Sequence, residues 1–244
     1  MTQRKTIAVI PARYASVRFP GKVLADLCGK PMIQHVWEKA AASKADEVLI
    51  ATDDERVVNA VERFGGNAVM TSPDHPSGTD RIYEAVSKTD AEIIINVQGD
   101  EPLIPVEVID QLIDKMQQDP KLEMGTVAVP KARAELEKDP NRVKVVFGDN
   151  GMALYFSRSM IPYLREGASD TTSYLHWGIY AYRRDILKRF ISMPVGRLEN
   201  CEKLEQLRAL ENGVGIFVLT SELESIGVDT PEDLEQAAAR LKRL

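Results

Sequence analysis

Three cationic residues and a glycine lie close together near the start of the chain, in the segment PARYASVRFPGK of residues 11–22. The cations are Arg13, Arg18 and Lys22. Such a segment can bind an anion, because the cations neutralise charge while backbone amides near Ser16 and Gly21 donate to phosphate oxygens. A P-loop is excluded, since Val23 replaces the metal-binding hydroxyl of that motif, and no GxGxxG fingerprint is present. The segment indicates an anion site, with a solvated basic turn as the alternative.

Two carboxylates are candidates for holding a metal ion. Asp100, in NVQGDEPLI, follows an apolar run and a glycine that permits a tight turn, so it lies at the carboxyl end of an expected strand. Mg²⁺ takes such oxygen ligands and bridges them to phosphate. An ordinary turn that starts a helix is the alternative. In GVDTPEDL, Thr230, Pro231 and Asp233 are explained as a helix cap, which leaves Asp229 as a candidate second ligand.

Other charged or titratable residues carry weaker signals. On a continuous helix over residues 198–212, Glu205 projects at the edge of the apolar face, so we expect it to meet an Arg, a bound ligand or water. The segment TDDE, residues 52–55, is explained as a helix start with Thr52 or Asp53 as cap. His35 is expected to face solvent or a satisfied partner, whereas His75 and His176 stay open.

Composition limits the class of protein. The chain has 244 residues, 44% of them apolar, and a net charge of −6 without clustered basic residues, which argues against a nucleic-acid or anionic-membrane partner. Cys28 and Cys201 lack a metal-binding pattern and indicate reduced thiols in a cytoplasm. Residues 1–16 resemble a secretion signal only superficially and are better interpreted as a first strand. No apolar run is long enough to cross a bilayer.

The elements that must position these residues alternate strand and helix patterns over the first 120 residues. The expected strands are 5–10, 47–51, 67–70 and 92–97, and the expected helices between them are 31–42, 55–65 and 79–88. This order predicts an α/β fold with a Rossmann-like, doubly wound, mostly parallel sheet, whose ligands bind beyond the carboxyl ends of the strands. From about 131 to 183, antiparallel strands indicate an inserted lobe. The helix over 198–212, a strand over 216–219 and a helix from Pro231 complete a single domain of residues 1–244.

Nine segments in register closely resemble one enzyme family over nearly the whole chain. They are PARYASVRFPGKVL, GKPMIQHV, ATDDERV, SGTDR, INVQGDEP, ALYFSRSMIP, GIYAYRRD, EKLEQLRALE and VDTPEDL. The family is the CMP-Kdo synthetases, also called 3-deoxy-manno-octulosonate cytidylyltransferases. The resemblance implies that CTP and the acid sugar Kdo give CMP-Kdo and pyrophosphate for lipopolysaccharide or capsule synthesis. It implies Mg²⁺ as cofactor, held by Asp100 and Asp229.

The same resemblance assigns roles to further residues. Catalysis is expected from Arg13, Lys22, Asp100 and Asp229. Nucleotide binding is expected from Pro11, Ala12, Arg13, Ser16, Arg18, Lys22, Ser77, Gly78, Asp80 and Gln98. Sugar binding is expected from Gln98, Arg158, Arg165, His176, Gly178, Tyr180, Glu205 and Gln206, and a guanidinium suits the sugar carboxylate. No residue can be identified as a general base from the sequence, so we expect the metal or a substrate group to lower the pKa of the attacking hydroxyl.

The sugar side departs from the family pattern in two places. Leu175 precedes His176 where many members carry a basic residue, and Asn200 stands near the place of a second histidine. The resemblance therefore leaves open an 8-amino-Kdo variant or another acid sugar such as a sialic acid. Outside enzymes, the alternatives are a nucleotide-binding regulator and a structural assembly protein. The lobe resembles the family's dimerisation region, so a homodimer is expected, and the cysteine pattern indicates a cytoplasmic location.

Overall fold

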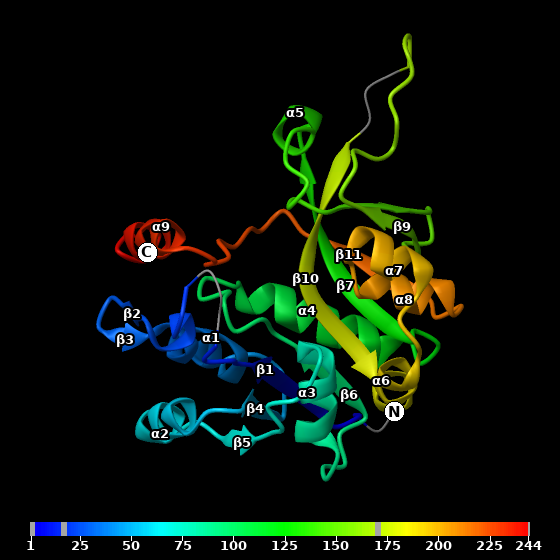
Figure 1. Cartoon of the computed structure of the whole chain (residues 1–244). Helices are drawn as coiled ribbons and strands as arrows, with labels where there is room; N and C mark the ends of the chain where they lie inside the picture. The colour runs from blue at the N-terminus through cyan, green and yellow to red at the C-terminus, as the bar shows by residue number, and fades with distance from the viewer. Residues whose placement is uncertain (1–2, 16–18, 169–171, 244) are drawn as a thin grey trace. The chain divides into compact units, whose positions relative to one another are not determined.

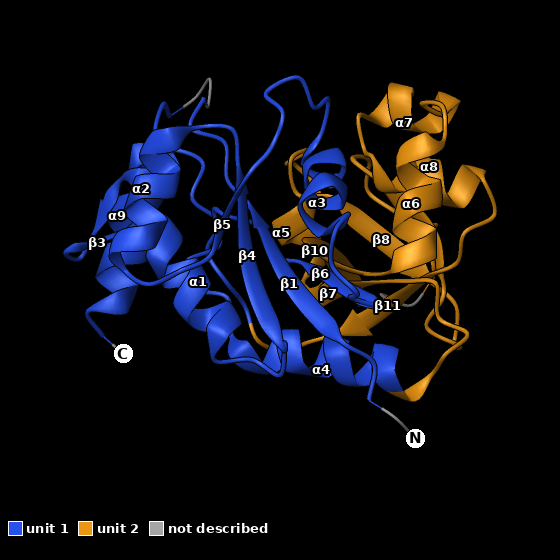
Figure 2. Cartoon of the chain, turned by 90° about the horizontal axis from the view of Figure 1, so that it is seen from below, with its two compact units in different colours: residues 1–117, 224–244 blue, residues 118–223 orange. Residues whose placement is uncertain are grey.

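The chain folds into two compact units, which Figure 2 shows in different colours. Unit 1 comprises residues 1–117 and 224–244, and unit 2 comprises residues 118–223. The structure is a computed structural model that describes residues 3–15, 19–168 and 172–243. Its parallel strands, antiparallel strands and interleaved helices confirm the predicted α/β class. The lobe predicted at 131–183 falls inside unit 2.

Unit 1 is built on four parallel strands in the order β6-β1-β4-β5. Their bounds are β1 Thr6–Pro11, β4 Glu47–Thr52, β5 Ala68–Met70 and β6 Ile93–Asn96. The apolar runs of β1 and β6 form strands because both of their faces are covered, and residues 7–10 and 93–95 have no exposed surface. After β5 the chain returns to the other side of β1, so the strand order reverses between β1 and β6.

Helices alternate with these strands, as the sequence predicts. They are α1 Met32–Ala41, α2 Glu55–Arg63, α3 Gly78–Val86, α4 Val106–Gln118 and α9 Pro231–Leu241. A short 3-10 helix, η1 Lys22–Leu24, and the hairpin β2 Asp26–Leu27 with β3 Lys30–Pro31 precede α1. The predicted cap of α2 was wrong: Asp54, not Thr52 or Asp53, accepts the amide of Arg56 at 2.9 Å.

The C-terminal segment returns to the N-terminal hairpin, where α9 lies beside β2 and β3 (Figure 1). Buried apolar side chains hold it there, namely Leu27, Met32, Leu103, Val228 and Ala237. Each large apolar side chain buried in this way contributes about 1.5–3 kcal/mol. The cluster fixes Val228 and therefore the position of its neighbour Asp229.

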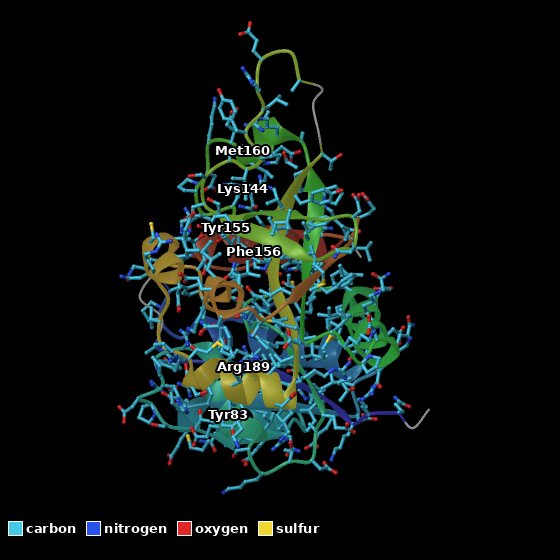
Figure 3. The ribbon with its side chains drawn as sticks, turned by 90° about the vertical axis from the view of Figure 1, so that its right-hand side faces the viewer. Tyr83, Lys144, Tyr155, Phe156, Met160 and Arg189 are labelled. Carbon is cyan, nitrogen blue, oxygen red and sulfur yellow. The ribbon has the colours of Figure 1, made fainter. Side chains whose placement is uncertain are left out.

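Unit 2 centres on β7, which pairs with β10 in antiparallel and with β11 in parallel orientation. The strands are β7 Met124–Lys131, β8 Lys144–Phe147, β9 Ala153–Ser157, β10 Ser173–Arg183 and β11 Ile216–Thr220. Strand β8 pairs with β10 and with β9. Lys144, Tyr155 and Phe156, labelled in Figure 3, lie on β8 and β9. The pairing of β10 with β7 shifts register between Trp177 and Tyr180.

The remaining helices of unit 2 correct one prediction. They are α5 Arg133–Leu136, α6 Arg184–Ser192, α7 Arg197–Glu202 and α8 Gln206–Glu211. The continuous helix predicted over 198–212 is wrong, because Lys203 adopts a left-handed conformation with φ of 53° between α7 and α8. Arg158 donates to the carbonyl oxygens of Glu202 at 2.7 Å and Lys203 at 3.4 Å, which satisfies the groups that the break leaves open.

No helix within the described residues is long and apolar enough to cross a membrane. Cys28 and Cys201 are exposed free thiols.

Candidate active site

A cavity of about 340 Å³ opens in unit 1 at the carboxyl ends of β1 and β6. It is lined by Pro11, Arg13, Ala15, Lys22, Val23, Pro76, Ser77, Gly78, Arg81, Gln98, Gly99 and Asp100. Open parallel sheets bind ligands where the strand order reverses, and β1 and β6 flank that point here. The volume falls in the range of small-molecule sites. The cavity therefore collects cations and a carboxylate from both loops that the sequence singled out.

The loop after β1 is closed by its own backbone. The Gly21 amide donates to the carbonyl oxygen of Tyr14 at 3.0 Å, and Gly21 adopts a φ of 71°, which favours glycine. The Arg56 guanidinium lies 3.4 Å above the centre of the Tyr14 ring, a cation–π contact that holds the loop against α2. The predicted residues Ser16 and Arg18 lie outside the described residues.

Arg13 is oriented by the segment between β5 and α3. Its guanidinium donates to the carbonyl oxygen of His75. The imidazole of His75 contacts the carboxylate of Glu84 on α3, and that carboxylate also accepts the Ser72 amide at 2.9 Å. The hydrogen bond from the Ser72 amide, and to a smaller extent that with the His75 imidazole, hold the pKa of Glu84 below its usual value. A charged Glu84 thus ties down the segment whose carbonyl positions Arg13.

Lys22 bridges the two carboxylates that the sequence proposed as metal ligands. Its Nζ lies 2.7 Å from Asp100 Oδ2, 3.0 Å from Asp229 Oδ1 and 3.1 Å from the carbonyl oxygen of Val228. Burial disfavours the charged ammonium, but the two carboxylates outweigh it and raise the pKa of Lys22 above its usual value. Asp100 and Asp229 therefore share one cation although they are 129 positions apart in the sequence.

The backbone brings the two carboxylates together. The turn from Gln98 to Glu101 closes with a hydrogen bond of 3.2 Å, and the Val228 amide donates to the carbonyl oxygen of Asp100 at 2.8 Å. Gly99 is needed for close approach, because a Cβ at this position would lie 2.8 Å from the carbonyl oxygen of Pro11. The ends of β1 and β6 can therefore touch only with glycine here.

Helix α3 begins at the cavity with the predicted SGTDR segment. Ser77 caps it by accepting the amides of Thr79 and Asp80, and the Ser77 hydroxyl donates to Asp80 Oδ2 at 2.6 Å. Asp80 thus serves the cap and does not line the cavity. Ala12 is fully buried and does not line the cavity either. Ser77, Gly78 and Gln98 do line the cavity.

Arg81, which the sequence patterns did not single out, lines the cavity and has no exposed surface. Its guanidinium donates to Asp53 Oδ2 at 2.6 Å and to the Thr71 hydroxyl, while its Nε has no partner among the described residues. Asp53, first explained as a helix cap, is therefore the counter-ion of a buried arginine. The signal was a cation next to Ile82 on the apolar side of α3.

The sugar-binding candidates of unit 2 centre on β10. His176 Nε2 lies 3.0 Å from the hydroxyl oxygen of Thr126, which donates to the Ile179 carbonyl oxygen at 2.8 Å. Because that hydroxyl has one proton, His176 must donate to it from Nε2. Burial lowers the pKa of His176 to about 3 and, with Tyr182 and Glu205 nearby, raises the pKa of Tyr180. Both side chains are neutral hydrogen-bonding groups at pH 7.

The other candidates of unit 2 lie in different settings. Glu205 is the N-terminal cap residue of α8 and not part of a continuous helix, with its Oε1 4.0 Å from an Arg208 nitrogen. Gln206 is buried at the start of α8, and Arg165 is exposed. Gly178 lies on β10 where its pairing with β7 shifts register. The Arg158 guanidinium donates to three backbone carbonyl oxygens, those of Pro140, Glu202 and Lys203.

Comparison with known proteins decides the family. The family model described as cytidylyltransferase matches residues 7–223. The 3-deoxy-manno-octulosonate cytidylyltransferase of Thermodesulfovibrio yellowstonii is 56% identical, over 95% of this chain and 96% of that protein. The chain belongs to the 3-deoxy-manno-octulosonate cytidylyltransferase family. The enzyme of the same name from Geobacter sulfurreducens is 51% identical over 96% of this chain and 98% of its own length.

A solved structure agrees with this cytidylyltransferase over nearly its full length. It is a CMP:2-keto-3-deoxy-manno-octonic acid synthetase in complex with CTP, with a TM-score of 0.94 and 46% identity. The match covers 98% of this chain and 99% of the other. The chain is therefore a nucleotidyltransferase, and the resemblance drawn from nine sequence segments is confirmed.

The donor set of this cytidylyltransferase fits a divalent metal ion. Asp100 and Asp229 supply the hard oxygen atoms that Mg²⁺ prefers, and they already share one positive charge. Within the described ranges, no group of three or more His, Cys, Asp or Glu side chains could hold a metal. An ion between these two carboxylates would therefore need further oxygen atoms from the nucleotide or water.

Proposed function

We propose that this chain transfers the cytidylyl group of CTP to 3-deoxy-manno-octulosonate (Kdo), giving CMP-Kdo and pyrophosphate for lipopolysaccharide or capsule synthesis. The observation that carries the proposal is the cavity of unit 1, which joins Arg13, Lys22 and Asp100 at the switch point of a sheet. The names of the relatives favour Kdo over an 8-amino form or a sialic acid.

The cations of the cavity suit a triphosphate. Arg13 and Lys22 line it from the loop after β1, and Ser77 and Gly78 line it from the start of α3. Amides at such a helix start attract anionic groups. Mg²⁺ held by Asp100 and Asp229 would draw charge from the phosphate oxygens and polarise the α-phosphorus. Arg13 then neutralises the charge that develops on the departing pyrophosphate.

The transfer itself is one in-line displacement. A bond forms between the anomeric oxygen of Kdo and the α-phosphorus, while the bond from that phosphorus to the bridging oxygen of the β-phosphate breaks. Pyrophosphate leaves with the bonding electrons, and the hydroxyl proton passes to solvent. His176 is a poor general base for this proton, because its pKa of about 3 leaves it with little affinity for protons at pH 7.

The residues proposed for the acid sugar come mainly from unit 2. A polyol needs many donors and acceptors, and His176, Tyr180 and Gln206 provide neutral ones. The exposed guanidinium of Arg165 suits the sugar carboxylate. Among the described residues, Arg158 uses three of its five N–H groups on backbone carbonyls, so it holds the end of α7 and keeps donors for a ligand.

The proposal includes a cytoplasmic homodimer. Exposed thiols at Cys28 and Cys201 suit a reducing compartment. Leu154 and Tyr163 of unit 2 are 67% and 85% exposed, which suits a surface that another copy covers. Light scattering at micromolar concentration should give twice the chain mass, and a monomer would contradict the dimer.

A substrate panel tests the function. Pyrophosphate release is measured with CTP, ATP, GTP or UTP, each combined with Kdo, 8-amino-Kdo or sialic acid in the presence of Mg²⁺. We expect release with CTP and Kdo at a rate well above every other pair. Release with sialic acid or 8-amino-Kdo but not with Kdo would reassign the sugar, and CTP binding without release for any sugar would favour a regulator.

A further inference from the structure

The position of Lys22 is difficult to reconcile with a single role on the phosphates. Its ammonium has three protons, and it lies within 3.1 Å of three acceptors: Asp100, Asp229 and the carbonyl oxygen of Val228. The side chain is 12% exposed, whereas Asp100 and Asp229 are 33% and 45% exposed. The two carboxylates are therefore open to solvent on one side and closed by an ammonium on the other.

We infer that Lys22 is an internal counter-ion that holds the Asp100–Asp229 pair in the nucleotide-free enzyme and yields it to a divalent cation when a triphosphate binds. This inference rests on the proposed function. An ammonium at 2.7 and 3.0 Å from the two carboxylates occupies the position that a bridging metal ion would need. Because ammonium and metal ion repel each other, the pair holds one or the other tightly, not both.

The side chain of Lys22 has the freedom that this exchange requires. Lys22 is the first residue of η1, and its backbone is fixed by Gly21 and by the hydrogen bond from Ala25 to the Lys22 carbonyl oxygen at 3.0 Å. The four-carbon stem can still move the ammonium by several ångströms without backbone change. Lys22 also lines the cavity with Arg13, so a bound triphosphate offers it a new anionic partner.

The exchange sets an order of loading. Without nucleotide, a metal ion must displace the Lys22 ammonium from both carboxylates with no phosphate to receive it, so binding is weak. With nucleotide, the phosphates take up Lys22 and supply oxygen atoms to the ion. The enzyme therefore takes up its metal ion with or after the triphosphate. Before nucleotide binds, the Lys22 ammonium also offsets the repulsion between the carboxylates of Asp100 and Asp229.

Titration of the nucleotide-free protein with Mn²⁺, followed by the EPR signal of the free ion, tests the inference. We expect weak binding to the wild type and at least tenfold tighter binding to Lys22→Met, which keeps the apolar stem but removes the charge. Lys22→Gln should behave alike and serves if the Met variant fails to fold. Asp100→Asn in the Lys22→Met background should abolish the gain.

Lys30→Met is the matched control, since Lys30 also pairs with a carboxylate, Glu38, at 2.8 Å, but outside the cavity. It should leave Mn²⁺ affinity unchanged. An affinity of the Lys22 variants equal to or weaker than that of wild type would overturn the inference. The titration uses neither CTP nor Kdo, so its result is independent of the substrate panel. Tighter Mn²⁺ binding by the Lys22 variants without pyrophosphate release by wild type would support the counter-ion role of Lys22 and reject the proposed transferase activity.

Discussion

Acidification should destabilise the protein because His176 binds a proton more readily in the unfolded chain than in the folded chain. Replacing His176 should remove this part of the pH dependence. Its pKa of about 3 lies below the ordinary value of 6.5, so the unfolded chain binds a proton at mildly acid pH and the folded chain does not. Stability from this residue is complete above pH 6.5 and is lost as the pH falls from 6.5 towards 3. At pH 5 the loss is about 2 kcal/mol, since each pH step costs about 1.4 kcal/mol.

The assay compares wild type with His176→Gln in urea unfolding at pH 7 and pH 5. A Trp37→Phe background leaves Trp177, the neighbour of His176 in unit 2, as the fluorescent reporter. The Gln amide can still donate to the Thr126 hydroxyl, so the variant keeps that contact but cannot take up a proton. Between pH 7 and pH 5, wild type should lose about 2 kcal/mol more than the variant.

Imidazole ¹⁵N shifts of His176 provide the direct check. The ring should stay neutral, with its proton on Nε2, from pH 8 down to pH 5. An imidazolium at pH 6, or equal stability losses for wild type and His176→Gln, would refute the reasoning and would reopen a role for His176 as a general base.

Two further substitutions test the walls of the cavity. Gly99→Ala should raise the KM for CTP at least tenfold and lower the melting temperature, because the new Cβ would lie 2.8 Å from the Pro11 carbonyl oxygen; unchanged values of both would contradict the close approach. Glu84→Gln should raise the KM for CTP severalfold with kcat nearly unchanged, because a neutral side chain holds His75, and so Arg13, less firmly. The pKa of Glu84 is lowered, so the KM of wild type for CTP should rise in the same way only as the pH falls below the ordinary carboxyl range. Equal KM values for wild type and Glu84→Gln at pH 7 would count against the positioning role.

Much of unit 1 could be predicted from the sequence because its signals are local. The apolar runs of β1 and β6 are buried on both faces, and the helix signals between them need no distant partner. Asp229 emerged by elimination, because Thr230 and Asp233 already completed the helix cap. The contact of Asp229 with Lys22 could not be predicted, since it depends on the return of the chain after residue 223 and on the buried cluster around Val228.

The sequence predictions that were wrong share one physical cause, because contacts with residues distant in the sequence overrode the local patterns. The break between α7 and α8 keeps a helical period on both sides, and only the carbonyl acceptors of Arg158 and the left-handed Lys203 reveal it. Asp53 looked like a cap, yet its carboxylate serves Arg81 from a distant helix. Burying a charge needs a counter-charge, so a cation on an apolar helix face should have prompted a search for its acidic partner.

The most direct test of the central claim is ³¹P NMR of CMP-Kdo and pyrophosphate formed from CTP, Kdo and Mg²⁺ by wild type and by Asp100→Asn. We predict equal amounts of both products with wild type. The variant should form them at least about 100-fold more slowly, a barrier increase of about 3 kcal/mol, because one preorganised electrostatic element is removed. Wild type that forms no CMP-Kdo, or a variant that forms it at the wild-type rate, would contradict the account.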